Sequence, residues 1–324
     1  MSVPATADAF TEAAEPHRRE LLAHCYRMLG AVPDAQDAVQ ETMLRAWKAH
    51  GRFDPGRASM RTWLYRIATN VCLTALQSRG RRPLPSGVGP MFDDPDAPFA
   101  PGLDVPWLQP LPDAVLAGGP GDPADAATER AGVRLALVAA VQLLPPRQRA
   151  VLLLREVLHY SAAEVATMLD TSVAAVNSAG QRGRARLAGL DVAAEAARGP
   201  DPVEDDLVDR YADALARADV AGLVRLVTTD ALLEMPPMRN WYVGRVAYGG
   251  FMARIFATRG TDWRTVRTSA NGQPALAAYR GDGDVHRLHT LQVFSARDGL
   301  LDRTTVFQDA DVFGLFELES TLAR

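Results

Sequence analysis

Cysteine and lysine are scarce in this sequence, and long apolar runs are absent. The two cysteines, Cys25 and Cys72, lie far apart within helical patterns, and Lys48 is the only lysine. Such cysteine spacing is typical of buried thiols in a cytosolic protein, so we expect no disulfide, metal or cofactor. No apolar stretch approaches the roughly 20 residues of a membrane-spanning helix. The segment from Met1 to Glu20 carries acids and lacks the apolar core of a secretion signal, which predicts a cytoplasmic protein.

A net positive charge is also lacking, which at first disfavours a nucleic-acid partner. The formal net charge is −4, but residues 1–80 carry 10 basic and 8 acidic residues, and residues 129–190 carry 8 and 4. Residues 83–127 contain seven acids and no basic residue, and residues 191–324 carry 15 basic against 20 acidic residues. Two mildly basic segments are thus joined by an acidic linker and followed by an acidic domain.

The linker, residues 83–127, is rich in proline. It holds 11 of the 22 prolines. Because proline fixes φ and removes a hydrogen-bond donor, we expect no regular domain here. One apolar island, which includes Trp107, Leu108 and Leu111, is best explained as a loop that docks a tryptophan on a neighbouring domain. A second break at Gly199 to Pro202 precedes the last domain.

The first helical domain is predicted over residues 10–82. Asp34 is a plausible N-cap for a helix that runs to about His50, and a further helix spans about Ser59 to Ser78. The helix that runs to about His50 has apolar residues at helical spacing, which predict one buried stripe of Val39, Met43, Ala46 and Trp47. Its other face would by itself indicate only a solvated surface, formed by Asp37, Gln40, Glu41, Leu44 and Arg45.

The second helical domain, about residues 128–190, contains a helix-turn-helix pattern. Ser161 and Glu164 form a capping box at the start of a short helix. Asp170 tolerates the positive φ of the turn, and Ser172 or Thr171 caps a second helix, with Val173 and Val176 inward. Polar and basic residues lie on its outer side, namely Asn177, Ser178, Gln181, Arg182, Arg184 and Arg186. Asn and Gln can pair with adenine and Arg with guanine in the major groove, although a solvated basic face would look alike.

Two motif sets together resemble a known family. Leu144-Pro145-Pro146-Arg147-Gln148-Arg149 and the segments Ser161–Ala166 and Thr171–Ser178 are similar to region 4 of the extracytoplasmic-function (ECF) sigma factors. Asp34–Thr42 and Arg61–Asn70 are similar to their region 2. The resemblance implies a transcription initiation factor that binds core RNA polymerase and promoter DNA.

The resemblance also implies roles for individual residues. The helix around Asp37, Gln40, Glu41, Leu44 and Arg45 matches the surface that binds the β′ clamp helices, and region 4 matches the domain that meets the β flap. Asn70 matches the residue that captures an unstacked base of the minus-ten element. Further DNA contacts are implied for Arg66, Arg79, Arg81 and Arg82. The outer side of the second helix matches the reader of the minus-thirty-five element, and the linker matches the segment that threads polymerase channels.

Gly180 and Gly183, in the second helix of the helix-turn-helix, depart from the family pattern. Because each costs about 1 kcal/mol in a helix interior, they predict a helix that frays without DNA.

The last domain, residues 203–324, has no place in a minimal ECF factor. Helices are predicted over 204–218, 220–227 and 245–258, and strands over 232–235, 264–270, 274–280, 286–296 and 301–308. This order predicts an α+β fold and resembles the SnoaL-like, cone-shaped fold. With Pro106 to Pro110 in the linker, it resembles SigG-type ECF factors in particular.

The function of this last domain is less determined by its residues. Trp241, Tyr242, Phe251 and Trp263 can line a ligand pocket, although core packing explains them better. No catalytic pair stands out, so we expect a regulatory module rather than an enzyme. The alternatives are a helix-turn-helix regulator that acts without polymerase and a ligand-binding or enzymatic domain fused to a DNA-binding scaffold. A small ligand and a separate anti-sigma protein remain open.

Overall fold

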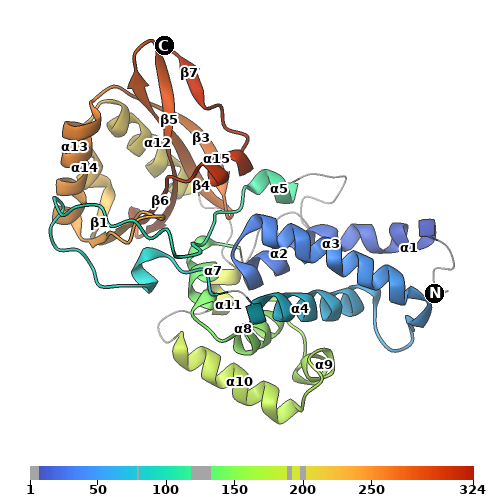
Figure 1. The fold of residues 1–324 in the computed structure, drawn as a ribbon. Helices are drawn as coiled ribbons and strands as arrows, with labels where there is room; N and C mark the ends of the chain where they lie inside the picture. Colours follow the sequence, from blue (N-terminus) through green and yellow to red (C-terminus); the bar gives the residue numbers. More distant parts are fainter. Residues whose placement is uncertain (1–6, 79, 118–132, 188–191, 198–201) are drawn as a thin grey trace. The chain divides into compact units, whose positions relative to one another are not determined.

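The computed structural model describes residues 7–78, 80–117, 133–187, 192–197 and 202–324. The chain forms two compact units. One combines Met1–Arg82 with Ala114–Arg198, and the other combines Pro83–Asp113 with Gly199–Arg324. The first unit is helical, whereas the second contains a sheet with helices (Figure 1). Both fold classes expected from the sequence are therefore confirmed.

The first helical domain consists of four helices, α1 (Ala7–Ala14), α2 (Arg18–Leu29), α3 (Val32–Ala49) and α4 (Met60–Ser78). Gly30 ends α2 with a φ of 75°, a left-handed conformation that glycine adopts without strain. Helix α3 follows at once with Ala31 as N-cap, so the predicted N-cap Asp34 is wrong and lies in the first turn. Val39 and Ala46 are buried as expected, but Trp47 is 37% exposed because it lies at the margin of the buried stripe.

The second helical domain contains the predicted helix-turn-helix. Helices α7 (Leu135–Gln142) and α8 (Pro146–Leu152) lead through a single π turn, η4 (Leu153–Val157), into α9 (Ala162–Met168) and α10 (Val173–Arg186). The capping box at Ser161 and Glu164 is present in full, and Asp170 adopts the expected positive φ of 49°. Ser172 caps α10 by accepting a hydrogen bond from the amide of Ala175 at 3.1 Å. A short helix, α11 (Val192–Ala197), packs against η4.

The second unit is built on one curved sheet. Its strands are β1 (Val227–Glu234), β2 (Trp241–Val243), β3 (Trp263–Ala270), β4 (Gln273–Asp282), β5 (Val285–Arg297), β6 (Leu300–Phe307) and β7 (Thr321–Ala323). The order is β2-β1-β6-β5-β4-β3, with β7 paired to β5. Only the β1–β6 pair is parallel among the described strand pairs. The strands predicted from alternating residues are thus present, while the short β2 and β7 were not predicted.

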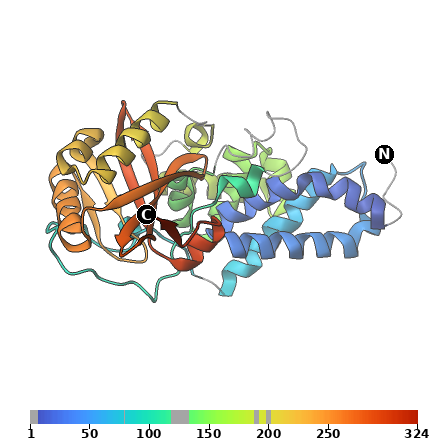
Figure 2. The ribbon, with the colours of Figure 1, turned by 90° about the horizontal axis from the view of Figure 1, so that it is seen from above.

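Helices enclose the core of this unit. They are α12 (Pro202–Ala216), α13 (Val220–Leu226), α14 (Arg245–Arg259) and α15 (Ala310–Leu315). Helices α12 and α14 pack on the sheet, and α13 packs on both of them (Figures 1 and 2). Their aromatic residues meet those of the strands: the rings of Tyr211 and Phe294 are 4.8 Å apart between centroids. Tyr248 donates a hydrogen bond to the Tyr211 hydroxyl at 3.0 Å.

The proline-rich segment Pro83–Asp113, called the strap here, belongs to the second unit. Phe92 and Phe99 pack against the core of this unit, and Phe99 meets Phe251 edge to face at 6.3 Å. The sequence correctly predicted little regular structure, since the strap contains one short turn of helix, Pro85–Gly87. The sequence also predicted a docked tryptophan. The indole N–H of Trp107, which is half-buried, donates a hydrogen bond to the carbonyl of Gly102 in the same segment at 2.8 Å.

Three buried polar side chains of the second unit hold the strap. The Glu234 carboxylate accepts hydrogen bonds from the Ser86 hydroxyl at 2.8 Å and from Arg303 at 3.0 Å. Asn240 accepts one from the amide of Ala100 at 2.7 Å, and Asn271 accepts one from the amide of Leu111 at 2.9 Å. Glu234, Asn240 and Asn271 are all fully buried. Because a buried polar group without a partner is costly, the strap completes the fold of this unit.

Candidate functional site

Helix α10 presents to solvent the residues that the sequence assigns to duplex DNA. Its buried face, formed by Val176, Ala179, Gly180 and Gly183, packs toward α8. Exposed side chains are those of Asn177, Gln181, Arg182, Arg184 and Arg186, and Ser178 is half-buried. Val173 was expected to face inward but is 44% exposed, because it is the first residue of the helix and precedes the buried stripe.

The two glycines of α10 have a packing role that the sequence did not reveal. Helix α10 runs unbroken through both of them. A Cβ atom added at Gly183 would lie 2.7 Å from Cδ1 of Leu152, whereas one at Gly180 would lie 3.6 Å from Cγ1 of Val151. Gly183 therefore permits close approach of α10 to α8. The expectation of a frayed helix differs from this finding, because propensity alone does not include tertiary contacts.

Asn70 lies on the exposed side of α4 and is engaged by the helix-turn-helix. Its amide nitrogen donates to the carbonyl of Arg66 at 2.9 Å and to the carbonyl of Met168, the last residue of α9, at 3.4 Å. Trp63, a neighbouring aromatic residue, packs on Phe53 with ring centroids 5.0 Å apart. The two helical domains thus meet at the residue that the family resemblance assigns to an unstacked base.

A buried arginine joins the same two domains. Arg149 is 1% exposed and donates to the carbonyls of Val141 and Gln142 at 2.9 and 3.0 Å, and also to the carbonyl of Met28 in α2. Gln142 in turn donates to the carbonyl of Arg27 at 3.0 Å. Burial lowers the pKa of Arg149 to about 10, which still leaves it charged at neutral pH. Arg149 also donates to the side-chain oxygen of Gln142 at 2.8 Å. The sequence marked Arg149 only as part of a motif, because most of its partners are backbone carbonyls that no side-chain pattern reveals.

A charged network lies beside this contact. Glu20 in α2 accepts hydrogen bonds from His17 at 2.6 Å, from Arg61 at 2.7 Å and from the Tyr65 hydroxyl at 3.1 Å. Arg61 also donates to the Tyr160 hydroxyl of the second helical domain at 3.3 Å. Burial alone would raise the pKa of Glu20, but the hydrogen bond from His17 and the charge of Arg61 outweigh burial and lower it.

The outer face of α3 carries the residues that the resemblance assigns to polymerase. Asp37, Gln40, Leu44 and Arg45 are exposed and Glu41 is half-buried. Leu44 is 53% exposed, and it borders a groove that Phe10, Met43 and Trp47 also line. Arg45 and Glu41 form an ion pair at 2.6 Å. An apolar groove edged by charges is the composition expected of a protein–protein contact.

The arginines of α4 and of the segment after it are not equivalent. Arg66 and Arg81 are exposed. Arg82 is half-buried and forms an ion pair with Asp34 at 2.8 Å, so the structure gives it a role in joining the end of this domain to α3. Arg79 lies outside the described residues.

The four aromatic residues expected at a ligand pocket of the last domain do not gather at one site. Phe251 and Trp263 line a cavity of about 30 Å³, together with His289 and Gln292. Tyr242 packs on Phe251 with ring centroids 5.4 Å apart. Trp241 donates its indole N–H to the carbonyl of Gly89 in the strap at 3.1 Å. Burial lowers the pKa of His289 to about 4, so its ring is neutral at pH 7.

No helix among the described residues is long and apolar enough to cross a membrane. Likewise, His, Cys, Asp and Glu form no metal-binding group within that part of the chain. The cysteines Cys25 and Cys72 are free and buried, as predicted, although α2 and α4 bring their thiols into hydrogen-bond contact.

Comparison with known proteins identifies three parts of the chain. Residues 13–82 match the model of Sigma-70 region 2, residues 134–187 that of Sigma-70 region 4, and residues 208–304 that of the SnoaL-like domain. The ECF RNA polymerase sigma factor SigG of Mycobacterium tuberculosis is 47% identical over 97% of this chain and 85% of its own length. SigW of Bacillus subtilis, another such factor, is 33% identical over 56% of this chain and 87% of its own length.

A solved structure shares the fold over nearly the whole chain. The crystal structure of the extracytoplasmic function sigma factor SigJ of Mycobacterium tuberculosis matches with a TM-score of 0.65 at 23% identity, over 94% of this chain and 98% of that one. Two sigma-70 regions in the expected order, a helix-turn-helix with polar and basic residues in solvent and a relative at 47% identity over 97% of this chain lead to one conclusion. The chain belongs to the ECF RNA polymerase sigma factors and carries a C-terminal SnoaL-like domain.

Proposed function

We propose that this sigma factor binds core RNA polymerase through the outer face of α3 and reads promoter DNA with α4 and α10. The observation that carries the proposal is the exposed Leu44 at the edge of an apolar groove, with Gln40 beside it. The β′ clamp helices are the partner assigned to this groove, and the β flap is assigned to the second helical domain. This work takes place in the cytoplasm, where polymerase and promoters are found.

The contact between the helical domains represents a closed form in this proposal. The Asn70 amide is hydrogen-bonded to the carbonyl of Met168, and a side chain that is bonded to α9 is not free to hold an unstacked base. Promoter elements at minus ten and minus thirty-five are read at separate places on DNA, so the two domains must part. Binding of α3 and of the second helical domain to different polymerase elements supplies the free energy for this change.

The C-terminal domain modulates this activity by holding the strap. The strap corresponds to the linker that threads polymerase channels in the family resemblance, and the same backbone amides cannot bond to Asn240 and Asn271 while lying in a channel. Docking of the strap therefore competes with assembly on polymerase. The geometry supports a regulatory rather than an enzymatic domain, because the cavity of about 30 Å³ beside Phe251 and Trp263 is far below the roughly 300–1,000 Å³ of small-molecule sites.

Run-off transcription with purified core polymerase tests the proposal. A template that carries the protein's own upstream region should give a promoter-specific transcript only when both the factor and core are present. A conventional helix-turn-helix regulator would instead bind duplex DNA and give no transcript with core alone. Absence of a specific transcript on genomic template libraries would contradict the proposed function.

A further inference from the structure

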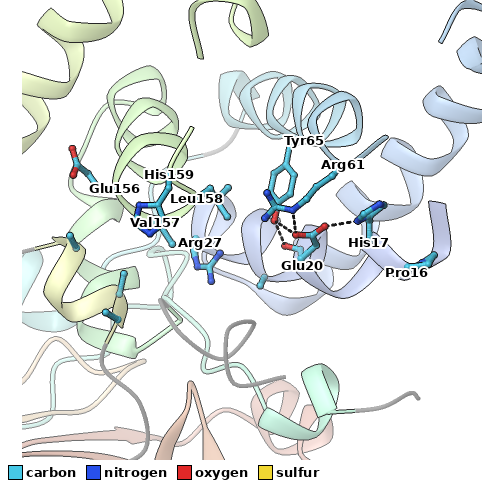
Figure 3. A pocket seen from close by; sticks show the side chains of 14 residues that line it. Pro16, His17, Glu20, Arg27, Arg61, Tyr65, Glu156, Val157, Leu158 and His159 are labelled. Carbon is cyan, nitrogen blue, oxygen red and sulfur yellow. Dashed lines mark hydrogen bonds and ion pairs between the residues drawn. The ribbon is translucent and has the colours of Figure 1, made fainter. Parts of the chain in front are cut away.

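A cavity of about 570 Å³ lies where the two helical domains meet (Figure 3). This volume falls within the roughly 300–1,000 Å³ of small-molecule sites. One wall comes from the first helical domain and includes Glu20, Arg27 and Arg61; the opposite wall comes from the turn Glu156 to His159 and from α11. We call this space the seam cavity.

The polar wall of the seam cavity is positively charged. Two guanidinium groups, Arg27 and Arg61, and two histidines, His17 and His159, face it together with two carboxylates. One carboxylate, Glu20, is paired with Arg61 at 2.7 Å, and the other, Glu156, is paired with Arg184 of α10 at 2.7 Å. The surplus positive charge therefore belongs to Arg27. Burial lowers the pKa of Arg27 to about 10, so its guanidinium remains protonated at neutral pH. The surplus positive charge lies in a partly enclosed space, where attraction to an anion is stronger than in bulk water.

The remaining wall is apolar and built from small side chains. Ala23 of α2 and Ala193, Ala196 and Ala197 of α11 line it, together with Val157 and Leu158. Small side chains leave room for a hydrocarbon body, and the surplus charge of Arg27 attracts a carboxylate. The combination therefore suits an amphipathic molecule with one anionic group.

We propose that the seam cavity binds a small organic carboxylate with a short apolar body, and that the bound molecule holds the two helical domains together. Because the lining residues come from both domains, a ligand in the cavity contacts both walls only in the closed form. Such a ligand shifts the population toward that form, in which Asn70 is bonded to Met168. The regulatory consequence rests on the proposed function, whereas binding itself does not.

Binding is tested on the full-length chain with hexanoate as the probe, and with hexanol and hexylamine as controls of equal chain length. Hexanoate should bind saturably in calorimetry and raise the unfolding temperature of the helical unit with concentration. Hexanol should bind at least about tenfold more weakly, because it lacks the charge that Arg27 attracts. Absence of saturable hexanoate binding, or equal binding of hexylamine, would overturn the proposal.

Two matched substitutions locate the site. Ala197→Phe places a ring in the cavity and should reduce hexanoate affinity about tenfold or more, whereas Ala163→Phe, at an exposed position of α9 outside the cavity, should leave it unchanged. Arg61→Gln should weaken hexanoate relative to hexanol, since it leaves the Glu20 carboxylate in the cavity without its ion-pair partner. Equal binding by all three variants and the parent protein would place the probe elsewhere and overturn the assignment.

Transcription separates this inference from the proposed function. Hexanoate should lower run-off transcription by the parent protein and not by Ala197→Phe. If hexanoate binds in the cavity and transcription is unchanged, the holding role is wrong. If no specific transcript forms even without hexanoate, the proposed function fails, while the binding experiment still decides the fate of the cavity.

Discussion

At the scale of single residues, Gly183, Arg149 and Asn70 are the positions where the contacts in the structure differ most from what the residue type alone predicts. Gly183 weakens a helix by propensity, yet it lies where no side chain fits against Leu152. Arg149 is a charged residue inside an apolar contact, and it is satisfied by backbone carbonyls of both helical domains. Asn70 keeps its predicted place on α4, with its amide already engaged. Residue identity indicated the chemistry of these positions but not their partners.

The two glycines of α10 give a matched pair of substitutions. Gly183→Ala should destabilise the helical unit by about 1–3 kcal/mol, because the new methyl group would overlap Leu152. Gly180→Ala should be neutral or stabilise by up to about 1 kcal/mol, since its Cβ has ordinary van der Waals distance and alanine favours the helix. Urea unfolding followed by circular dichroism measures both. Equal effects would show that close packing is not what Gly183 provides.

The exposed Arg182 tests the reading face of α10. Arg182→Ala should weaken binding to the minus-thirty-five element by about 1–3 kcal/mol and change the base preference at one position. Arg217→Ala, at an exposed arginine just after α12, serves as the charge-matched control and should leave promoter preference unchanged. Binding to promoter variants in gel-shift or anisotropy assays measures both. Unchanged preference in Arg182→Ala would mean that the assigned face is wrong.

His24 makes the helical unit sensitive to acid. Its side chain is fully buried, and burial, with a smaller effect from the charge of Arg27, lowers its pKa to about 3. In the unfolded chain this pKa returns to about 6.5, so the unfolded state binds the extra proton between these values. Stability should therefore fall as the pH drops below about 6.5, by about 2–3 kcal/mol at pH 4.5.

Substitution isolates the contribution of this histidine. Thr69 donates its hydroxyl proton to the carbonyl of Tyr65, so it accepts a hydrogen bond from Nε2 of His24 at 2.9 Å. His24→Gln keeps a donor for Thr69 without a titrating group. Its free energy of unfolding should vary less between pH 7 and pH 4.5 than that of the parent protein. An identical pH profile would assign the acid sensitivity to other groups.

At the scale of elements, regular patterns were predictable and irregular contacts were not. Alternating residues located β3, β4, β5 and β6 within one or two residues, and the capping box located α9, because both signals are local. The three-residue strands β2 and β7 are too short to show a pattern. The outer face of α3 was predicted as a surface. The exposure of Trp47 was not predicted, because it depends on where α1 packs, and the sequence of α3 alone does not give that position.

The groove on α3 is the element on which polymerase binding depends in the proposed function. Leu44→Asp should weaken binding to core polymerase about tenfold or more, because it replaces an exposed apolar side chain of the groove with a charge that binding would remove from water. Val246→Asp, at a residue of α14 that is 90% exposed, is the control and should bind as the parent protein does. Competition with a labelled sigma factor for core polymerase provides the measurement. Equal affinities for both variants would exclude this groove.

At the scale of the whole molecule, the main departure from expectation is the strap. Proline content correctly indicated an irregular segment, but composition cannot show which domain an irregular segment joins. Its partners, among them Glu234, Asn240 and Asn271, lie more than 100 residues later in the sequence. Arg254 adds two hydrogen bonds to the carbonyls of Pro95 and Ala97 and covers the ring of Phe99 at 4.6 Å. A domain that begins at residue 203 therefore omits part of its own core.

Loosening the strap should change transcription as well as stability. Phe99→Ala should lower the stability of the second unit by about 2–4 kcal/mol, since it leaves a gap beside Phe251. It should also raise run-off transcription at limiting core polymerase, because a strap that leaves its site is available to polymerase. Val246→Ala, at a residue of α14 that is 90% exposed, should do neither. Lower stability with unchanged transcription would restrict the strap to a structural role.

The hydrogen bond from the amide of Leu108 to the carbonyl of Pro83, at 3.1 Å, brings the two ends of most of the strap together. The chain between these two residues therefore forms a closed loop that adds almost nothing to the distance the linker can span. The tether from Arg82 to α7 at Leu135 has a contour length of about 170 Å when fully extended, and closing the loop reduces it to about 90 Å. In the proposed function, docking of the strap on the C-terminal domain therefore halves the maximum separation of the two helical domains.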